Sequence, residues 1–324
     1  MYNVHRVRKI IIAHTYRKKN LMKQFWSKTS TLVITAIFCC TLWGSAYPCI
    51  KVGYRLFSIA SGDVPGQLFF AGCRFALAGI LVILAGSLPQ KRLLLPEKSD
   101  WKPIAALALF QTILQYIFFY MGLARASAVR SSIINGTGAF VAILLAVYMF
   151  RLEKMTIKKF IGCFLGFSGV LLVETVGQTV NFGFAWNGEG FILLSVFASS
   201  MASILIKIFS RDHNPVLLSG WQFFTGGLTM AIVAFLFGGR MTVGAPTSLL
   251  LLLYMAFISS AAYTLWGVLL KYHPVSHVTV FNFVTPVAGV LLSSVILSEH
   301  GVLNGSVLIA LVLVCGGILV VSRE

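Results

Sequence analysis

The stretch LVITAIFCCTLWGSAYPCIKV, residues 32–52, decides the fold class, because its one charged side chain, Lys51, lies near the end of an otherwise uncharged run. About 20 apolar residues are enough for a helix to cross the hydrocarbon core of a bilayer. Ten such runs can be drawn along the chain. They are Leu32–Val52, Gln67–Gly86, Ile104–Leu123, Ser131–Phe150, Met155–Val173, Gly188–Phe209, Val216–Gly238, Leu249–Leu270, Val278–Leu297 and Val302–Val321. Backbone groups in hydrocarbon must pair within their own segment, so each run is predicted to be a helix.

The composition supports the same class. Of the 324 residues, 58% are hydrophobic and 11% charged, and the mean hydropathy is +0.88. Soluble domains carry about 45–50% apolar and about 25% charged residues. A water-soluble fold is therefore excluded, and the short connections leave no room for a sizeable soluble domain. The sequence predicts an all-α membrane protein with ten transmembrane helices.

The basic residues predict the orientation. Most Lys and Arg residues fall on the side of the N-terminus, whereas Lys51, Arg55, Arg125, Arg130 and Arg240 fall on the other side. Cytoplasmic loops carry the excess of positive charge. We therefore expect both termini to be cytoplasmic and the protein to lie in the plasma (inner) membrane.

Residues 1–30 form a basic segment without acids and are expected to be a cytoplasmic tail. An acid-free, Arg-containing N-terminus is also typical of a mitochondrial presequence, but this one lacks a clear amphipathic helix. Translation starting at Met22 would remove the first 21 residues, so the start of the mature chain stays open.

The net charge of +17 raises the question of nucleic-acid binding. Outside the tail, however, the cations lie at the ends of apolar runs, where they orient helices, and they form no groove with stacking aromatics. The expected partners are a small-molecule solute and the lipid bilayer, not nucleic acid. A homodimer is left open.

The two halves of the chain resemble each other. Gly44-Ser45-Ala46 with Ile50-Lys51 in the first run matches Ser200-Met201-Ala202 with Ile206-Lys207 in the sixth. Similarly, Leu152-Glu153 closes the fourth run and Ser298-Glu299 the ninth.

These matches predict two five-helix repeats, residues 31–175 and 187–323. An odd number of helices per repeat places the second upside down relative to the first. Inverted repeats are the architecture of many secondary transporters, whose substrate site lies near the midplane between the halves.

The chain resembles the ten-helix members of the EamA-type family in the drug/metabolite transporter superfamily. The marks are Leu42-Trp43-Gly44-Ser45, Arg74-Phe75-Ala76, Ala126-Ser127-Ala128, Glu153-Lys154-Met155-Thr156, Gly166-Phe167-Ser168-Gly169-Val170, Thr285-Pro286-Val287 and Ser298-Glu299. The chain departs from the pattern in having Gly136-Thr137-Gly138 where the second half has Thr285-Pro286-Val287. The resemblance implies membrane transport of small solutes, in a family whose substrates range from amino acids to nucleotide sugars.

Polar and aromatic side chains inside the predicted spans are the candidates for lining a substrate cavity. A buried amide or hydroxyl must find a partner, which is either a solute or a neighbouring helix. The resemblance implies that Asn135 and Asn282 lie in helices packed around the cavity, so they rank first. The candidates are Gln115, Tyr116, Tyr120, Asn135, Thr137, Tyr263, Trp266 and Asn282.

Arg74 is a ninth candidate, because it lies near the middle of the second predicted helix. A charge there costs roughly 2.5–3.5 kcal/mol on insertion scales, so Arg74 should face the bundle or a wet cavity. Two roles are open: a contact to a substrate carboxylate, or a structural tie to backbone carbonyls or Asp63. Because the family carries an arginine here whatever its substrate, the structural role is favoured.

Other chemistry lacks support in the sequence. There is no HExxH, GxSxG or Walker A motif, so we expect neither an enzyme nor an ATP-driven pump. The pair His273 and His277 straddles Pro274 without a carboxylate, and the six cysteines form no CxxC pair. No catalytic residue, metal site or cofactor is therefore predicted.

The predicted function is that of a secondary transporter or facilitator, an exporter or exchanger of small polar metabolites such as amino acids. The alternative is a non-transporting membrane scaffold or sensor with the same fold. No acid lies at a helix centre, so we expect exchange or facilitated diffusion without obligatory proton movement. Glu174 and Glu299 lie nearest to the predicted spans.

Overall fold

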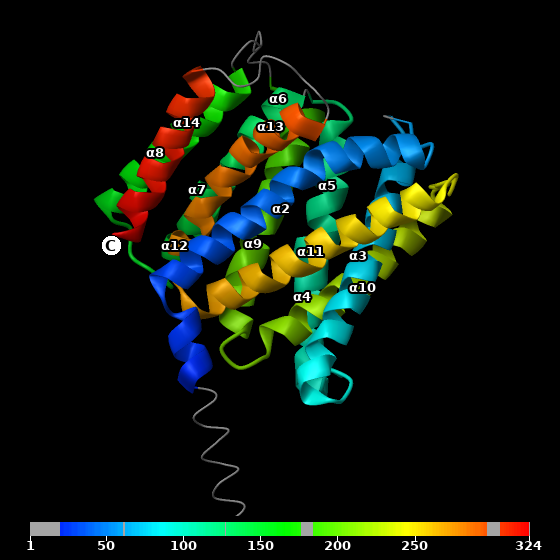
Figure 1. Cartoon of the computed structure of the whole chain (residues 1–324), viewed down its shortest axis with the longest axis horizontal. Helices are drawn as coiled ribbons and strands as arrows, with labels where there is room; N and C mark the ends of the chain where they lie inside the picture. Colours follow the sequence, from blue (N-terminus) through cyan, green and yellow to red (C-terminus); the bar gives the residue numbers. More distant parts are fainter. Residues whose placement is uncertain (1–19, 61, 127, 176–183, 297–304, 324) are drawn as a thin grey trace, which may run out of the picture.

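The computed structural model describes residues 20–60, 62–126, 128–175, 184–296 and 305–323, and the regular structure in these ranges is entirely helical. Figure 1 shows these helices packed together in one bundle, from the N-terminal helices in blue to the C-terminal helix α14 in red. The basic tail is predicted over residues 1–30. Its first 19 residues lie outside the described ranges, and residues 20–26 form a short helix.

The first half contains five helical spans. The elements are α2 (Thr29–Leu56), α3 (Val64–Ser87), the continuous α4 (Trp101–Leu107), η3 (Ala108–Leu114) and α5 (Gln115–Leu123), then α6 (Ala128–Gly136) with α7 (Gly138–Leu144) and η4 (Leu145–Met149), and α8 (Ile157–Thr175). The helix ends differ from the predicted runs by only a few residues. For example, α2 extends three residues before the predicted start at Leu32.

The second half repeats this order. Its elements are η5 (Trp186–Gly190) with α9 (Phe191–Phe209), α10 (Pro215–Leu236), α11 (Pro246–Tyr272), then α12 (Val275–Thr279) with η6 (Val280–Phe283) and α13 (Val284–Ile296), and α14 (Gly305–Ser322). Side chains and prolines set several starts. Asn214 accepts a hydrogen bond from the backbone N–H of Val216, 3.0 Å away, and Pro215 occupies the first turn of α10, where a missing N–H costs nothing.

Within the described ranges, nine helical segments are long and apolar enough to cross a membrane. The remaining span, α8, is 19 residues long but carries Lys158, Lys159 and Glu174 at its two ends. It packs along α14, so it completes the set of ten. The prediction of an all-helical membrane protein with ten spans is confirmed.

The packing of the helices has the symmetry of an inverted repeat. The second helices of the two halves, α3 and α10, pack on each other, and so do the fifth, α8 and α14. The first helix, α2, packs on α11 and α13, while its counterpart α9 packs on α5 and α7. These main contacts between the halves come in equivalent pairs, which supports the duplicated architecture. Figure 1 shows α8 and α14 side by side.

Small residues allow the central pair of helices to approach closely. A Cβ atom added at Gly227 of α10 would lie 2.8 Å from the backbone carbonyl carbon of Phe75 in α3, and one added at Gly72 would lie 2.8 Å from Cα of Ala231. No side chain fits at such distances. This is the packing that helices in lipid favour, because apolar side chains gain little by leaving lipid and backbone proximity supplies the contacts.

Two spans are interrupted at equivalent points. Thr137 separates α6 from α7, and the 3-10 turn η6 (Val280–Phe283) separates α12 from α13. The displacement of 146 residues that relates Glu153 to Glu299 in the sequence also relates Thr137 to Phe283, the last residue of η6. The backbone stays helical at both breaks: Thr137 has φ −71° and ψ −9°, and its N–H donates to the carbonyl oxygen of Ile134 in a local 3-10 turn. Irregular helix at corresponding positions of two repeats is typical of the substrate region of inverted-repeat transporters.

Candidate functional site

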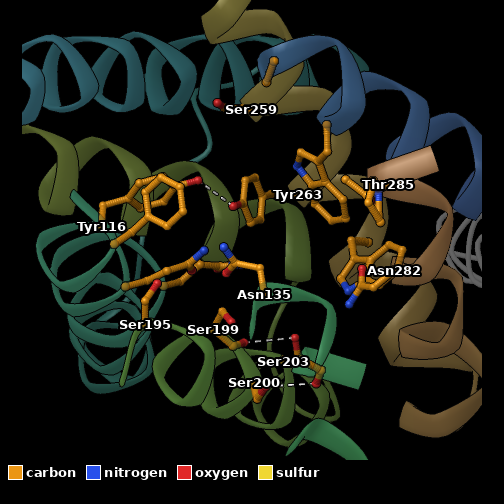
Figure 2. A pocket seen from close by; sticks show the side chains of 18 of the residues that line it. Tyr116, Asn135, Ser195, Ser199, Ser200, Ser203, Ser259, Tyr263, Asn282 and Thr285 are labelled. Carbon is orange, nitrogen blue, oxygen red and sulfur yellow. Dashed lines mark hydrogen bonds between the residues drawn. The ribbon is translucent and has the colours of Figure 1, made fainter. Parts of the chain in front are cut away.

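A cavity of about 230 Å³ lies between the two halves of the bundle (Figure 2). Its wall includes Trp43 of α2, Arg74 of α3, Gln111 of η3, Ser199 of α9 and Ser259 of α11. Each of these residues lies close to the middle of its span, so the cavity is at the depth of the bilayer centre. Its volume is below the ≈ 300–1,000 Å³ of pockets that hold drug-sized ligands.

Both helix breaks contribute to the cavity wall. Asn135, Gly136 and Gly138 flank the interruption at Thr137, and Asn282 belongs to η6. Figure 2 shows Asn135 and Asn282 on different sides of the same space, with Thr285 beside Asn282. The two asparagines that rank first from the sequence thus lie on one cavity, and the helix breaks bring them there.

Aromatic side chains join the halves across another part of the wall. The hydroxyl groups of Tyr116 from α5 and Tyr263 from α11 are 2.8 Å apart and share a hydrogen bond (Figure 2). The Trp43 ring makes edge-to-face contacts with Tyr263 and Trp266, with centroids 5.0 Å apart in both cases. The buried indole Nε1 of Trp43 has no hydrogen-bond partner within the described residues.

Serines on α9 form a polar wall that is absent from the sequence-based candidates. Ser195, Ser199 and Ser203 follow one another at intervals of four residues, and Ser200 lies beside them (Figure 2). The Ser200 hydroxyl donates to the carbonyl oxygen of Gly138 at 3.1 Å, which ties α9 to the break between α6 and α7. The spacing of four in an otherwise apolar helix is the signal that could have revealed this wall.

Seven of the nine predicted site residues line the cavity: Arg74, Gln115, Tyr116, Asn135, Tyr263, Trp266 and Asn282. The structure places Thr137 at the helix break itself, where its hydroxyl donates to the carbonyl oxygen of Ile134 at 2.6 Å. Tyr120 is fully buried in an apolar cluster with Phe75 and Phe223, away from the cavity wall. One helical turn beyond Tyr116, its side chain points into the packing of α3 and α10 instead.

Arg74 is the single charged residue among the described residues that line the cavity. Its side chain is 3% exposed, and Cζ lies 4.3 Å from the centroid of the Phe75 ring. Of the structural ties that the sequence left open for Arg74, to backbone carbonyls or to Asp63, the second does not form. Asp63 caps α3 eleven residues earlier, about 16 Å away along a helix rising 1.5 Å per residue, and accepts a hydrogen bond from the N–H of Gly66.

On the side of the N-terminus, Glu153 connects the halves. It accepts hydrogen bonds from the hydroxyl and the N–H of Ser276, at the start of α12, and pairs with the Nζ of Lys159 at 3.1 Å. Burial acts to raise the pKa of Glu153, but the bonds from Ser276 and Lys159 outweigh it and hold that pKa below its ordinary value. The motif Glu153-Lys154-Met155-Thr156 thus fastens the first repeat to the second.

On the opposite side, two carboxylates hold the first turns of α6. Nη1 of Arg130 lies 2.6 Å from Oε1 of Glu189 in η5. Ser132, which lines the cavity, donates to Oε1 of Glu174 at 2.5 Å. Glu174 lies near the end of α8, as expected, and its hydrogen bond with Ser132 of α6 brings it next to the cavity wall. Glu299, the other acid near a predicted span, lies outside the described residues.

The fold and the site define a class: a membrane protein of two inverted five-helix repeats with a polar cavity at their interface, which is the architecture of secondary transporters. A family model for EamA-like transporters matches residues 30–175 and 186–323. The chain belongs to the EamA-like transporter family.

Several relatives of this chain are named as transporters. A WAT1-related chloroplastic protein of Arabidopsis thaliana is 26% identical over 71% of this chain, and an uncharacterized transporter of Synechocystis is 28% identical over 65% of it. The matches span 54% and 66% of these two proteins. The uncharacterized transporter YvbV of Bacillus subtilis is 25% identical over 94% of both chains.

One solved crystal structure, described only as that of a protein, superimposes with a TM-score of 0.74 at 18% identity. The match covers 91% of this chain and 98% of the other. At that identity the likeness establishes the fold alone.

Proposed function

We propose that the protein is a secondary transporter, a facilitator or exchanger, that moves small polar metabolites such as amino acids. The observation that carries the proposal is the mid-membrane cavity, whose wall is drawn from both repeats and meets both helix breaks. Its volume and its mixture of amide, hydroxyl and aromatic groups suit a small polar solute better than a drug-sized apolar one.

Contacts between the two repeats, one on the side of the N-terminus and one on the opposite side, fit alternating access. The contacts of Glu153 with Ser276 and of Arg130 with Glu189 each join elements from different repeats. Rocking of one repeat against the other must break these contacts one at a time. We place the protein in the plasma membrane with both termini in the cytoplasm, and we propose export or exchange as its direction.

Counterflow in proteoliposomes tests this function. Vesicles containing the purified full chain are loaded with an unlabelled mixture of amino acids and diluted into labelled members of the same mixture. Transient accumulation above the level of protein-free vesicles is expected. Asn282→Leu, on the cavity wall, should reduce the initial rate by at least tenfold, whereas Phe164→Leu, which is exposed on α8, should not change it.

A non-transporting scaffold or sensor predicts a different result. Folded protein in vesicles would give no counterflow with any member of the mixture, and Asn282→Leu would be indistinguishable from the parent. That outcome would overturn the proposed transport function.

A further inference from the structure

The charge balance of the cavity is uneven. Within the described residues that form its wall there is one arginine and no Asp, Glu, Lys or His. Three ion pairs in the described part of the chain, Arg130 with Glu189, Lys159 with Glu153 and His213 with Asp100, all lie elsewhere. The cavity therefore has a single, uncompensated positive charge.

The surroundings of Arg74 support its cationic group without neutralising it. The rings of Phe75 and Tyr116 lie 4.3 Å and 5.6 Å from Cζ, which is cation–π distance. Rings provide no hydrogen-bond acceptor for the five N–H groups of a guanidinium. Nε of Arg74 is buried and has no hydrogen-bond partner within the described ranges.

We propose that Arg74 binds a carboxylate of the transported solute, and that the cavity selects small carboxylates over their neutral or cationic analogues. The inference rests on the proposed transport function and deepens it. An arginine is permanently charged and presents a planar fork that matches a carboxylate with two parallel hydrogen bonds. A carboxylate at this position supplies the missing counter-charge.

The serine wall adds a second requirement. The hydroxyl of Ser199 donates to the carbonyl oxygen of Val196 at 2.9 Å, and that of Ser203 to the carbonyl oxygen of Ser199 at 3.2 Å. The hydroxyl of Ser200 donates to the carbonyl oxygen of Gly138. Because each hydroxyl proton is already engaged, these oxygens offer lone pairs to the cavity. The solute therefore carries hydrogen-bond donors, an ammonium or hydroxyl group, in addition to its carboxylate.

Cations are disfavoured for the same reason. A solute with a net positive charge would enter a space of about 230 Å³ that already contains the Arg74 charge and no acid among its described wall residues. Like charges in a poorly solvated site repel strongly. The cavity therefore excludes organic cations that are small enough to fit.

The test compares matched solutes in proteoliposomes of the full chain. The labelled probes are L-lactate and L-alanine, their amides lactamide and alaninamide, and glycerol as a neutral polar solute, with leakage through protein-free vesicles subtracted. Counterflow of lactate and alanine is expected to be at least tenfold faster than that of the amides. A factor of ten corresponds to about 1.4 kcal/mol of discrimination.

Variants assign this selectivity to Arg74. Arg74→Gln should lower the carboxylate-to-amide rate ratio to near one by losing lactate counterflow and gaining lactamide counterflow, a gain that misfolding cannot produce. Arg74→Lys should keep part of the ratio, because the charge remains without the fork. Lys51→Gln, which removes an exposed cation from α2, should leave the ratio unchanged.

The outcomes separate the two proposals. Counterflow of glycerol or the amides as fast as that of the carboxylates would overturn the assignment of Arg74 and leave transport intact. The assignment is equally overturned if Arg74→Gln keeps the parental ratio. If the parent moves none of the five probes and none of the amino-acid mixture, both proposals fail. If Arg74→Gln does not fold, the ratio measured for the parent alone decides the selectivity.

Discussion

The contact between Glu153 and Lys159 is a sensitive point of the fold, because both side chains are buried. The exposed fractions of the two side chains are 9% for Glu153 and 6% for Lys159, and Glu153 also accepts two hydrogen bonds from Ser276. Glu153→Gln removes the charge but keeps the size of the side chain. It removes the carboxylate charge that lies 3.1 Å from the ammonium of Lys159, in a place that water hardly reaches.

Removing one partner of a buried ion pair costs about 3–5 kcal/mol. Lys159 also donates to the carbonyl oxygen of Lys154 at 2.7 Å, so part of its hydrogen bonding survives. We therefore expect the lower end of that range, about 3 kcal/mol. At roughly 2–4 °C per kcal/mol for a chain of this order of size, the midpoint of thermal unfolding should fall by about 6–12 °C.

The assay is thermal unfolding of the purified protein in detergent at neutral pH. Lys158→Gln is the matched control, because Lys158 is exposed and, among the described residues, its Nζ donates to the carbonyl oxygen of Arg323 at 3.3 Å. The midpoint of this variant should stay within about 1 °C of the parent. The double variant Glu153→Gln with Lys159→Met should recover much of the loss, since the buried charge is gone. A midpoint for Glu153→Gln equal to that of the parent, or a double variant less stable than the single, would refute the reasoning.

Three further predictions follow from the described contacts. Because its pKa is held low in the folded protein, Glu153 stabilises the fold above about pH 4.3, the ordinary pKa of Glu. This stabilisation is lost as the pH falls further, through the lowered pKa. Unfolding midpoints measured from pH 6 to 3 should therefore fall more steeply for the parent than for Glu153→Gln. Gly227→Ala pushes a Cβ into the backbone of α3 and should cost about 1–3 kcal/mol, whereas Gly316→Ala, which meets nothing within 4 Å, should be neutral or slightly stabilising in the same denaturation assay. Counterflow should persist without a pH gradient, and Glu174→Gln should retain it. If a pH step alone drives uphill accumulation in the parent but not in Glu174→Gln, the carboxyl group next to Ser132 couples transport to protons.

The sequence alone determined the class of this protein and the positions of its helices. Runs such as residues 32–52 and the distribution of Lys and Arg act through the bilayer, whose thickness and polarity treat each segment almost independently. The internal matches, such as Glu153 with Glu299, indicated the inverted halves, because duplication leaves a trace in the order of residues. These features need no knowledge of which helix faces which.

The tertiary structure decided which side chains share the cavity. Asn135 and Asn282 were predictable because polar groups within a span need partners. The serines of α9 gave a weaker signal, their spacing of four residues, because a hydroxyl can satisfy itself on its own helix. Tyr120 shows the converse. One turn along the same face of α5 separates it from Tyr116, so rotation of the helix does not distinguish the two rings. Tyr116 lines the cavity, whereas Tyr120 meets the buried Phe75 of α3 and Phe223 of α10. Which side chains surround each turn depends on the summed contacts of both halves, and no local pattern in an almost uniformly apolar segment records it.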